Sequence, residues 1–331
     1  MKSDSAAASR AARGLGVTAA GLCAAAVLGA QSPMADNKVH VLPVQGNVYM
    51  LVGGPGGNIT MQASDEGVLL VDTSTAELSD AVLNAIRGVS TKPIRYIINT
   101  HAHADHVGGN AEIAKHGKMI EGGTMGMPYA GAAIIAHEKV LNRMSAPTGQ
   151  QAPFPTAAWP TDTYFTAKKE LFFNGEAVQI LHQPAAHTDG DSIVFFRRSD
   201  VLSAGDVFLT TTYPVIDLDH GGSIQGILAA LNNILDIAIP KDKQEGGTYV
   251  IPGHGRLCDE ADVLEYRDML TIIRDRIQDL VKKGATLADV KNSHPTLDYD
   301  ARYGAASGAW TTDKFVEAVY RNLSVNQTKR E

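Results

Sequence analysis

The chain has 331 residues, of which 44% are hydrophobic and 20% charged, an ordinary composition for a globular protein. That length is sufficient for one large α/β domain or two smaller ones with a substantial core. The formal net charge is −7 and no basic patch is apparent, which argues against nucleic acid as a partner because such binding depends on clustered positive charge.

The start of the chain differs from the rest. Lys2, Arg10 and Arg13 precede an uncharged run of small apolar residues at 14–30. A basic start, an apolar stretch and a small-residue end are typical of a secretory signal. A retained anchor is the alternative, although the run is short for a spanning helix. We therefore predict a signal peptide at residues 1–30, a periplasmic or secreted protein, and no stable membrane association after cleavage.

Cysteine usage limits the structural chemistry. The chain contains only Cys23 and Cys258, and cleavage of the predicted signal would leave Cys258 alone. An intramolecular disulfide is then excluded, as is a structural zinc ribbon, which needs paired cysteines.

Strands and helices are expected to alternate after the signal. Apolar alternation and short apolar runs predict strands, and a spacing of three to four residues predicts helices. In chain order we expect a hairpin at 39–51, a turn at 53–57 followed by a strand, a buried strand at 67–72, a helix at 78–86 and a strand at 94–98.

The second part of the chain repeats this order. We expect helices at 109–115 and 132–144, a long proline-containing loop at 145–165, strands at 177–181, 193–197 and 201–203, a helix at 223–235, a strand at 248–251 and a long amphipathic helix at 259–283. Two halves of this kind suggest an α/β fold with two sheets sandwiched between helices. We predict a hydrolase domain at 31–258 and a C-terminal helical extension at 259–331 that packs on it.

A cluster of metal-ligand residue types follows the strand at 94–98. His101 and His103 are two positions apart, so at an extended strand end they point the same way and can share one ion. Asp105 and His106 come after the turn and are placed to begin a second site. Imidazole and carboxylate are ligands that zinc accepts, so the cluster predicts a two-metal site.

Three further candidates lie at the ends of predicted strands, where loops carry function in layered folds. His187 begins His-Thr-Asp-Gly-Asp-Ser, Asp206 lies in Ser-Ala-Gly-Asp-Val, and His254 lies in Pro-Gly-His-Gly. Each is a weak signal alone, and the joint pattern is informative.

Taken together, these positions resemble the metallo-β-lactamase superfamily, whose pattern is His-x-His-x-Asp-His, then a His before a Thr, an Asp, and a His in a Pro-Gly-His turn. The resemblance covers residues 40–256 and implies a four-layer αββα sandwich. It also implies two Zn²⁺ ions, the first held by His101, His103 and His187, the second by Asp105, His106 and His254, with Asp206 bridging both.

The resemblance implies a hydrolytic reaction on a small-molecule substrate. Zinc lowers the pKa of bound water from about 16 to about 7, so a metal-bound hydroxide would open an amide or ester bond at neutral pH. Asp105 is the expected catalytic residue, orienting the nucleophile and passing a proton. A β-lactam or a lactone-like cyclic compound is the expected substrate.

Asp206 distinguishes branches of the superfamily, because familiar lactamases carry Cys or Ser there. An aspartate at this position is similar instead to the pattern of hydroxyacylglutathione hydrolases and lactonases. A phosphodiesterase, a thioester hydrolase, an iron-dependent redox enzyme and a non-catalytic binding protein are the alternatives, since imidazole and carboxylate also suit iron and manganese.

Other polar residues have two readings each. Asp72 can hydrogen-bond a ligating histidine or cap a strand, and Asp191 can do the same beside His187. Asp189 can likewise hydrogen-bond His187 or be a turn residue. Tyr213 can donate to a developing oxyanion or simply pack. Four histidines are expected to be structural: His137, His182, His220 and His294.

Overall fold

The computed structural model describes residues 38–120, 131–147, 152–243 and 246–328. The chain divides into two units, Met1–Met34 and Ala35–Glu331, and the described residues all belong to the second. The predicted signal peptide at residues 1–30 lies outside the described residues and stays a prediction. Within the described ranges, every helix is too short or too polar to cross a bilayer.

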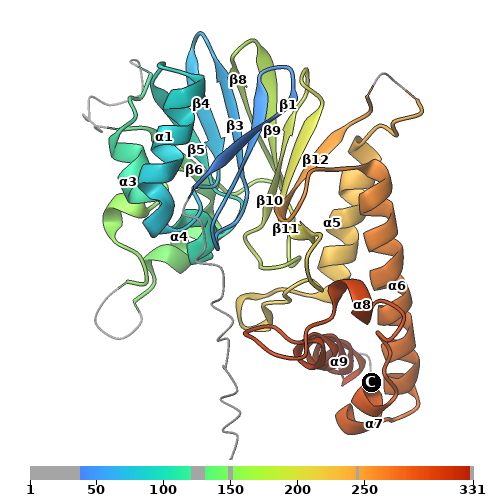
Figure 1. The fold of residues 1–331 in the computed structure, drawn as a ribbon. Coiled ribbons are helices and arrows are strands. Elements are labelled where there is room, and N and C mark those ends of the chain that lie inside the picture. The colour runs from blue at the N-terminus through green and yellow to red at the C-terminus, as the bar shows by residue number, and fades with distance from the viewer. Residues whose placement is uncertain (1–37, 121–130, 148–151, 244–245, 329–331) are drawn as a thin grey trace, which may run out of the picture. The chain divides into compact units, whose positions relative to one another are not determined.

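The first sheet has seven strands in sequence order. β1 to β4 pair antiparallel, and β4 to β7 pair parallel. The strands are β1 (His40–Gln45), β2 (Val48–Val52), β3 (Ile59–Ser64), β4 (Gly67–Val71), β5 (Ile94–Ile98), β6 (Ala133–His137) and β7 (Asp162–Tyr164). Helices α1 (Ser79–Val89) and α3 (Asn110–Lys115) cover its outer face (Figure 1).

The second sheet has six strands in the order β13-β12-β11-β10-β9-β8. Only the pair β11 and β12 is parallel. The strands are β8 (Lys168–Phe173), β9 (Glu176–His182), β10 (Ser192–Phe196), β11 (Val201–Leu209), β12 (Tyr249–His254) and β13 (Cys258–Asp259). Helices α5 (Ile224–Ile237) and α6 (Glu260–Lys282) lie along its outer face (Figure 1).

Short helices complete the described part of the chain. They are η1 (Ala76–Leu78), α2 (Ala104–Val107), α4 (Glu138–Ser145), η2 (Thr156–Ala158), η3 (Leu218–His220), α7 (Leu287–Asn292) and α8 (Asp300–Tyr303), followed by the longer α9 (Thr312–Thr328).

Apolar clusters fill the spaces between the layers. One lies between the sheets and joins Ile98 and Ile135 of the first sheet to Val194 and Ile251 of the second. A second lies between the first sheet and its helices, and a third between the second sheet and the helices on its outer face. Burial of this kind contributes about 25 cal/mol per Å² of apolar surface and is the main force holding the layers together. The predicted four-layer αββα sandwich is therefore confirmed.

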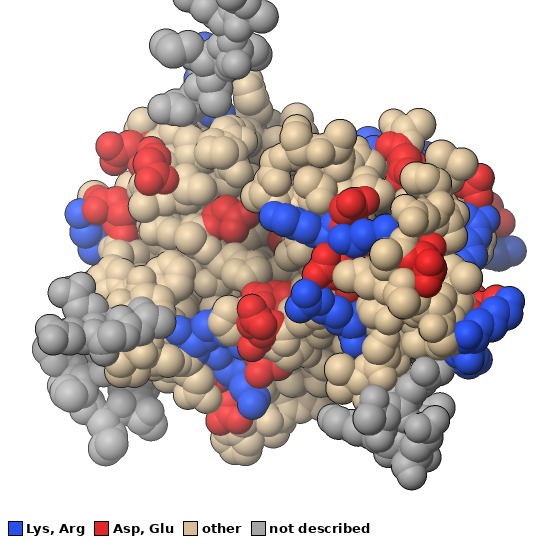
Figure 2. Space-filling view, turned by 90° about the horizontal axis from the view of Figure 1, so that it is seen from below, with Lys and Arg blue, Asp and Glu red and all other residues tan. Residues whose placement is uncertain are grey.

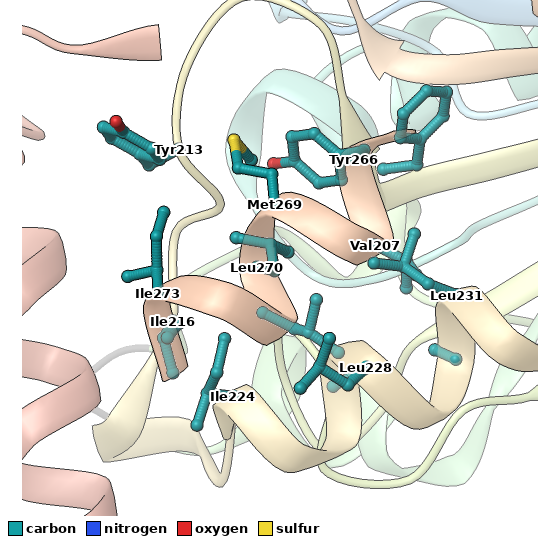
Figure 3. Packing of buried hydrophobic residues seen from close by; sticks show 14 of the residues in the cluster. Val207, Tyr213, Ile216, Ile224, Leu228, Leu231, Tyr266, Met269, Leu270 and Ile273 are labelled. Atoms are coloured by element: carbon teal, nitrogen blue, oxygen red, sulfur yellow. The ribbon is translucent and has the colours of Figure 1, made fainter. Parts of the chain in front are cut away.

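The long helix α6 packs as its sequence pattern predicts. Tyr266, Leu270 and Ile273 are buried on one side and belong to one apolar cluster with Ile224 and Leu228 of α5 (Figure 3). The helix begins at a capping box between Asp259 and Asp262, which satisfies amide groups that a free helix end leaves exposed. The same cluster includes side chains of α7, α8 and α9, so the residues after 258 share a core with the second sheet: Val290, Tyr303, Phe315, Val319.

The helix predicted at 132–144 is wrong in its first half. Residues Ala133–His137 form β6, which is fully buried between β5 and β7. Two isoleucines at its centre favour extended backbone in a buried parallel strand, where side chains on both faces are apolar. Helix α4 begins only after His137, whose imidazole accepts a hydrogen bond from the Lys139 amide at 3.3 Å.

Three further strands differ from the prediction. The loop predicted at 145–165 contains β7 and η2, although residues 148–151 lie outside the described part. Strand β8 was not expected, because as an edge strand it alternates exposed charged residues with partly buried ones. Strand β11 extends to Leu209, beyond the predicted 201–203, and its register shifts around Gly205, which has φ of 53°.

A buried carboxylate joins the two sheets. Glu176 accepts from Gln62 Nε2 of β3 at 2.7 Å and from Ser199 Oγ at 2.7 Å, and its second oxygen accepts from the Arg198 and Ser199 amides. We expect Glu176→Ala to lower the free energy of unfolding by about 2–4 kcal/mol, because the donors lose their acceptor. Urea denaturation measures this. Glu170→Ala, which removes an exposed carboxylate of β8, should change stability by less than about 0.5 kcal/mol, and equal losses in the two variants would contradict the assignment.

Candidate metal centre

All seven predicted ligand residues meet at one edge of the sandwich. They follow the carboxyl ends of β5 and β9 or lie in the last part of β11 and β12. Three groups of potential ligand atoms lie within 4.8 Å of one another: His101, His103 and His187; His101, His106 and Asp206; Asp105, His106 and His254. The second group is fully buried. His103, Asp105 and His254 are partly exposed and line a cavity of about 340 Å³.

Hydrogen bonds fix which nitrogen of His103 and His187 is free. His103 Nε2 donates to Asp217 Oδ2 at 3.1 Å, and His187 Nδ1 donates to the Val215 carbonyl at 2.7 Å. The remaining nitrogens, His103 Nδ1 and His187 Nε2, therefore carry lone pairs in the neutral rings. They face each other at 2.9 Å. Two lone pairs at that separation repel unless a cation lies against both.

Asp72 fixes the other two buried histidines. Its Oδ2 accepts from His106 Nδ1 at 2.8 Å and from Thr100 Oγ1 at 2.7 Å. Because the Thr100 hydroxyl proton goes to Asp72, its oxygen accepts from His101 Nδ1 at 3.0 Å. His101 thus presents an Nε2 lone pair to the interior of the site, and His106 does so in its neutral form. Burial lowers the pKa of His106, but Asp206 and Asp72 outweigh that effect and raise the pKa well above its ordinary value, so a metal ion at Nε2 would take the place of a proton. This confirms the reading of Asp72 as a residue that orients a candidate ligand.

Two buried polar atoms without a protein partner indicate that the cluster can hold metal ions. His101 Nε2 and Asp206 Oδ1 are buried and have no hydrogen-bond partner, which is costly unless another ligand satisfies them. Asp206 Oδ1 lies 3.1 Å from His106 Nε2, and Oδ2 lies 3.8 Å from His187 Nε2. One carboxylate oxygen therefore faces His106, a predicted ligand of the second ion, and the other faces His187, a predicted ligand of the first, as expected for a bridging residue.

The charge states of two buried groups, His101 and Asp206, also suit a cation. Burial lowers the pKa of His101 well below its ordinary value, and the neighbouring imidazoles act in the same direction, so its ring stays neutral. Burial raises the pKa of Asp206, but His106, His101 and His187 outweigh that effect and hold the pKa far below the usual range. A neutral imidazole and an ionised carboxylate are the forms that bind metal.

Two glycines allow the backbone to approach the cluster closely. A Cβ at Gly57 would lie 2.4 Å from the His106 ring, and a Cβ at Gly253 would lie 2.0 Å from Asp206 Oδ1. Neither position can accept a larger residue without displacing a candidate ligand.

The remaining candidates have structural contacts. Asp191 accepts from the Thr188 amide and hydroxyl rather than from His187. Asp189 pairs with Arg143 at 2.8 Å. Tyr213 is buried, stacks on Phe315 and donates to Asp300 Oδ1, so the packing reading is correct. His137 and His182 stack on each other at 3.7 Å.

Sequence reasoning missed the segment that follows β11. Asp217 and Val215 hold two of the candidate ligands, and His220, expected to be structural, donates to Asp217 Oδ2 at 2.6 Å. The spacing of these residues carried no signal, because Asp217 lies 114 positions from His103.

The cavity over the cluster is bounded by uncharged side chains beyond the candidate ligands: Leu209, Thr211, Thr212 and Val215. No Lys or Arg is among the described residues that line it. On the face seen in Figure 2, acidic and basic side chains are interspersed rather than gathered into one basic patch.

The fold and the cluster of ligand residues together define a class of protein, an αββα sandwich with a group of histidines and aspartates at one edge of its sheets. The family model of the metallo-beta-lactamase superfamily matches residues 52–254. The chain therefore belongs to the metallo-beta-lactamase superfamily, as the sequence pattern predicted.

Curated relatives carry different activities. A linear primary-alkylsulfatase from a Pseudomonas species is 25% identical over 260 residues, which cover 68% of this chain and 47% of the relative. A metallo-beta-lactamase type 2 from a Bacillus species is 22% identical over 219 residues, 65% of this chain and 73% of the relative. The chain thus spans about half the length of the alkylsulfatase.

Solved structures share the fold. The stereoselective inverting sec-alkylsulfatase Pisa1 from a Pseudomonas species superposes with a TM-score of 0.61 at 18% identity, covering 86% of this chain and 50% of its own. The metallo-beta-lactamase from Pontibacter korlensis gives 0.53 at 15% identity, covering 71% and 99%.

Proposed function

We propose that the chain is an exported hydrolase with a binuclear metal centre, zinc being the expected metal. The observation that carries the proposal is the convergence of lone pairs. His101, His103 and His187 each hold one ring nitrogen in a hydrogen bond and present the other to the interior of the site. Membership of the metallo-beta-lactamase superfamily supports it. Export rests on residues 1–30 alone.

When bound, two zinc ions supply an activated water and polarise the bond to be cleaved. The protein contributes placement and proton transfer. Asp105 reaches the cavity with a half-exposed carboxylate, and its Oδ2 lies 3.2 Å from His254 Nε2. Its pKa is lowered because the His254 contact outweighs the effect of burial, so it is ionised at neutral pH and can accept a proton at Oδ2. Leu209 and Val215 exclude water from one wall.

An activated carbonyl is the bond we expect to be cleaved, in a small lactam, lactone or other ester that fits a cavity of about 340 Å³. The uncharged far wall suits a substrate whose organic part is neutral. Thioesters remain in the same reaction class.

A sulfate ester is the second candidate, and one observation favours it. The match to the alkylsulfatase fold covers 86% of the chain, so it has to extend past residue 258 into the C-terminal helices, whereas the lactamase match covers 71%. Those helices share a core with the sheet that carries Asp206 and His254.

A substrate panel tests the proposal. The zinc-loaded protein is assayed against a chromogenic cephalosporin, a lactone, a thioester and a primary alkyl sulfate, with and without chelator, beside Asp105→Ala. We expect one class to be turned over, with loss of at least about 100-fold in the variant. Metal analysis of protein prepared without added metal runs in parallel. Failure to cleave any class faster than Asp105→Ala, or two equivalents of iron and little zinc, would overturn the proposal.

A further inference from the structure

The segment between β11 and α5 holds two candidate ligands of the same group. The Val215 carbonyl accepts from His187 Nδ1, and the Asp217 amide donates to the His187 carbonyl at 3.0 Å. Asp217 Oδ2 accepts from His103 Nε2. One segment therefore contacts His103 and His187 from the side away from the free nitrogens.

Among the described residues, the Asp217 carboxylate pairs with two imidazoles, those of His103 and His220. Its Oδ2 is shared between His103 Nε2 at 3.1 Å and His220 Nδ1 at 2.6 Å, and its Oδ1 accepts from the His220 amide at 3.1 Å. The side chain is 15% exposed while His220 is 48% exposed. The contacts with His220 of η3 thus hold the Asp217 carboxylate in the position from which it accepts from His103.

We propose that Asp217 is a positioning residue that selects the tautomer of His103 and thereby sets the affinity of one metal position without affecting the other. The inference rests on the proposed binuclear centre. A neutral imidazole carries one proton, so a carboxylate that accepts from Nε2 forces the lone pair onto Nδ1, the atom that faces His187. Without the carboxylate, the proton can occupy Nδ1, and that nitrogen can no longer bind a cation.

The two metal positions have separate supports. Asp72 holds His106 directly and His101 through Thr100, so it acts on both groups. The Asp217 carboxylate contacts His103 alone among the candidate ligands, and His103 belongs to the first group only. The expected signature of Asp217 is therefore a selective loss of one equivalent of metal.

The test compares Zn²⁺ binding by the unsubstituted chain, Asp217→Ala, Asp217→Asn and the control Asp219→Ala, an exposed carboxylate two residues away. Competition with a chromophoric chelator resolves the two equivalents. We expect Asp217→Ala to weaken one equivalent by about 10–100-fold and leave the other unchanged. Asp217→Asn keeps an acceptor for the His220 amide, so the η3 turn should be preserved. Its amide group cannot accept from His103 Nε2, so this variant shows the effect of the tautomer alone. His103→Ala should weaken binding of the same equivalent of zinc. Combining it with Asp217→Ala should cause no further loss.

A second measurement does not need metal. Two-dimensional ¹H–¹⁵N NMR of the histidine rings in metal-free protein reports the tautomer, and we expect His103 to change from Nε2–H to Nδ1–H or a mixture in both Asp217 variants. An unchanged tautomer, or equal weakening of both equivalents, would overturn the inference, as would the same effect in Asp219→Ala. If the unsubstituted chain binds two zinc ions but cleaves no substrate, the proposed function fails while the role of Asp217 stands.

Discussion

Replacing Asp206 by alanine should abolish turnover and reduce bound zinc from two equivalents to one or none. The carboxylate is buried and ionised, and it faces His106 with one oxygen and His187 with the other. Its removal takes a ligand from both positions, so the loss of activity should exceed the about 100-fold that follows loss of a residue that only orients a ligand. Metal analysis after dialysis and steady-state rates on the best substrate of the panel measure both effects.

Two further variants make that result specific. Asp206→Asn keeps the shape and one strong acceptor but loses the charge, so it should retain more metal than the alanine variant. Ser203→Ala, on the same strand, removes a buried hydroxyl that accepts from Thr60 at 2.9 Å and lies outside the ligand groups. It should lower stability by about 1 kcal/mol and leave the metal content unchanged. Full zinc occupancy in Asp206→Ala would show that the carboxylate is not a ligand.

The candidate site was largely predictable because its strongest signal is local. His101 to His106 lie within six positions at the end of a strand, and strand geometry alone places the first two on one side. His187, Asp206 and His254 were candidates because they lie at the ends of predicted strands, and the resemblance to the family pattern gave them their roles as ligands. The structure brings all seven residues together, and their role as ligands is the subject of the experiments above.

The fold was predictable where the pattern had a single period. The stripe on α6 has the helical spacing throughout, and five of its six expected residues are buried: Val263, Tyr266, Leu270, Ile273 and Ile277. The sixth, Leu280, is partly buried. Residues 132–144 combine a short buried strand with the start of a helix, and a run of apolar residues does not distinguish the two. Edge strand β8 has charged residues on both faces, and Phe172 lies on its exposed face, so the strand shows no regular alternation of apolar and polar residues.

The residues that orient the candidate ligands were the least predictable. Asp72 and Asp191 have the same sequence context, an acid near a strand end, and both accept the amide and hydroxyl of a threonine that adjoins a histidine. Only Asp72 also reaches an imidazole. That difference depends on where the ends of β4 and β5 lie relative to α2. Tertiary packing determines these positions, and the spacing of residues in the sequence does not.

Replacing Asp72 by asparagine should weaken zinc binding, because Asp72, unlike Asp191, accepts a hydrogen bond from an imidazole. Asp72→Asn preserves volume but turns one acceptor oxygen into a donor. With its remaining oxygen kept by the Thr100 amide, the new amide group faces His106 Nδ1, which must then accept, and the ring proton moves to Nε2. His106 would lose its free lone pair, and the chain through Thr100 to His101 would be disturbed as well. We expect zinc affinity to fall by about 10–100-fold and turnover to fall with it.

Asp191→Asn is the matched control for this variant. Asp191 is as buried as Asp72 and makes the same pair of bonds to Thr188, but it contacts no candidate ligand. Its burial raises its pKa, so a neutral amide is a mild replacement there. We expect both variants to lose comparable thermal stability, while only Asp72→Asn loses zinc. If the two variants lose zinc equally, Asp72 acts through the stability of the fold and not through the tautomer of His106, because the tautomer is the one feature that the two sites do not share.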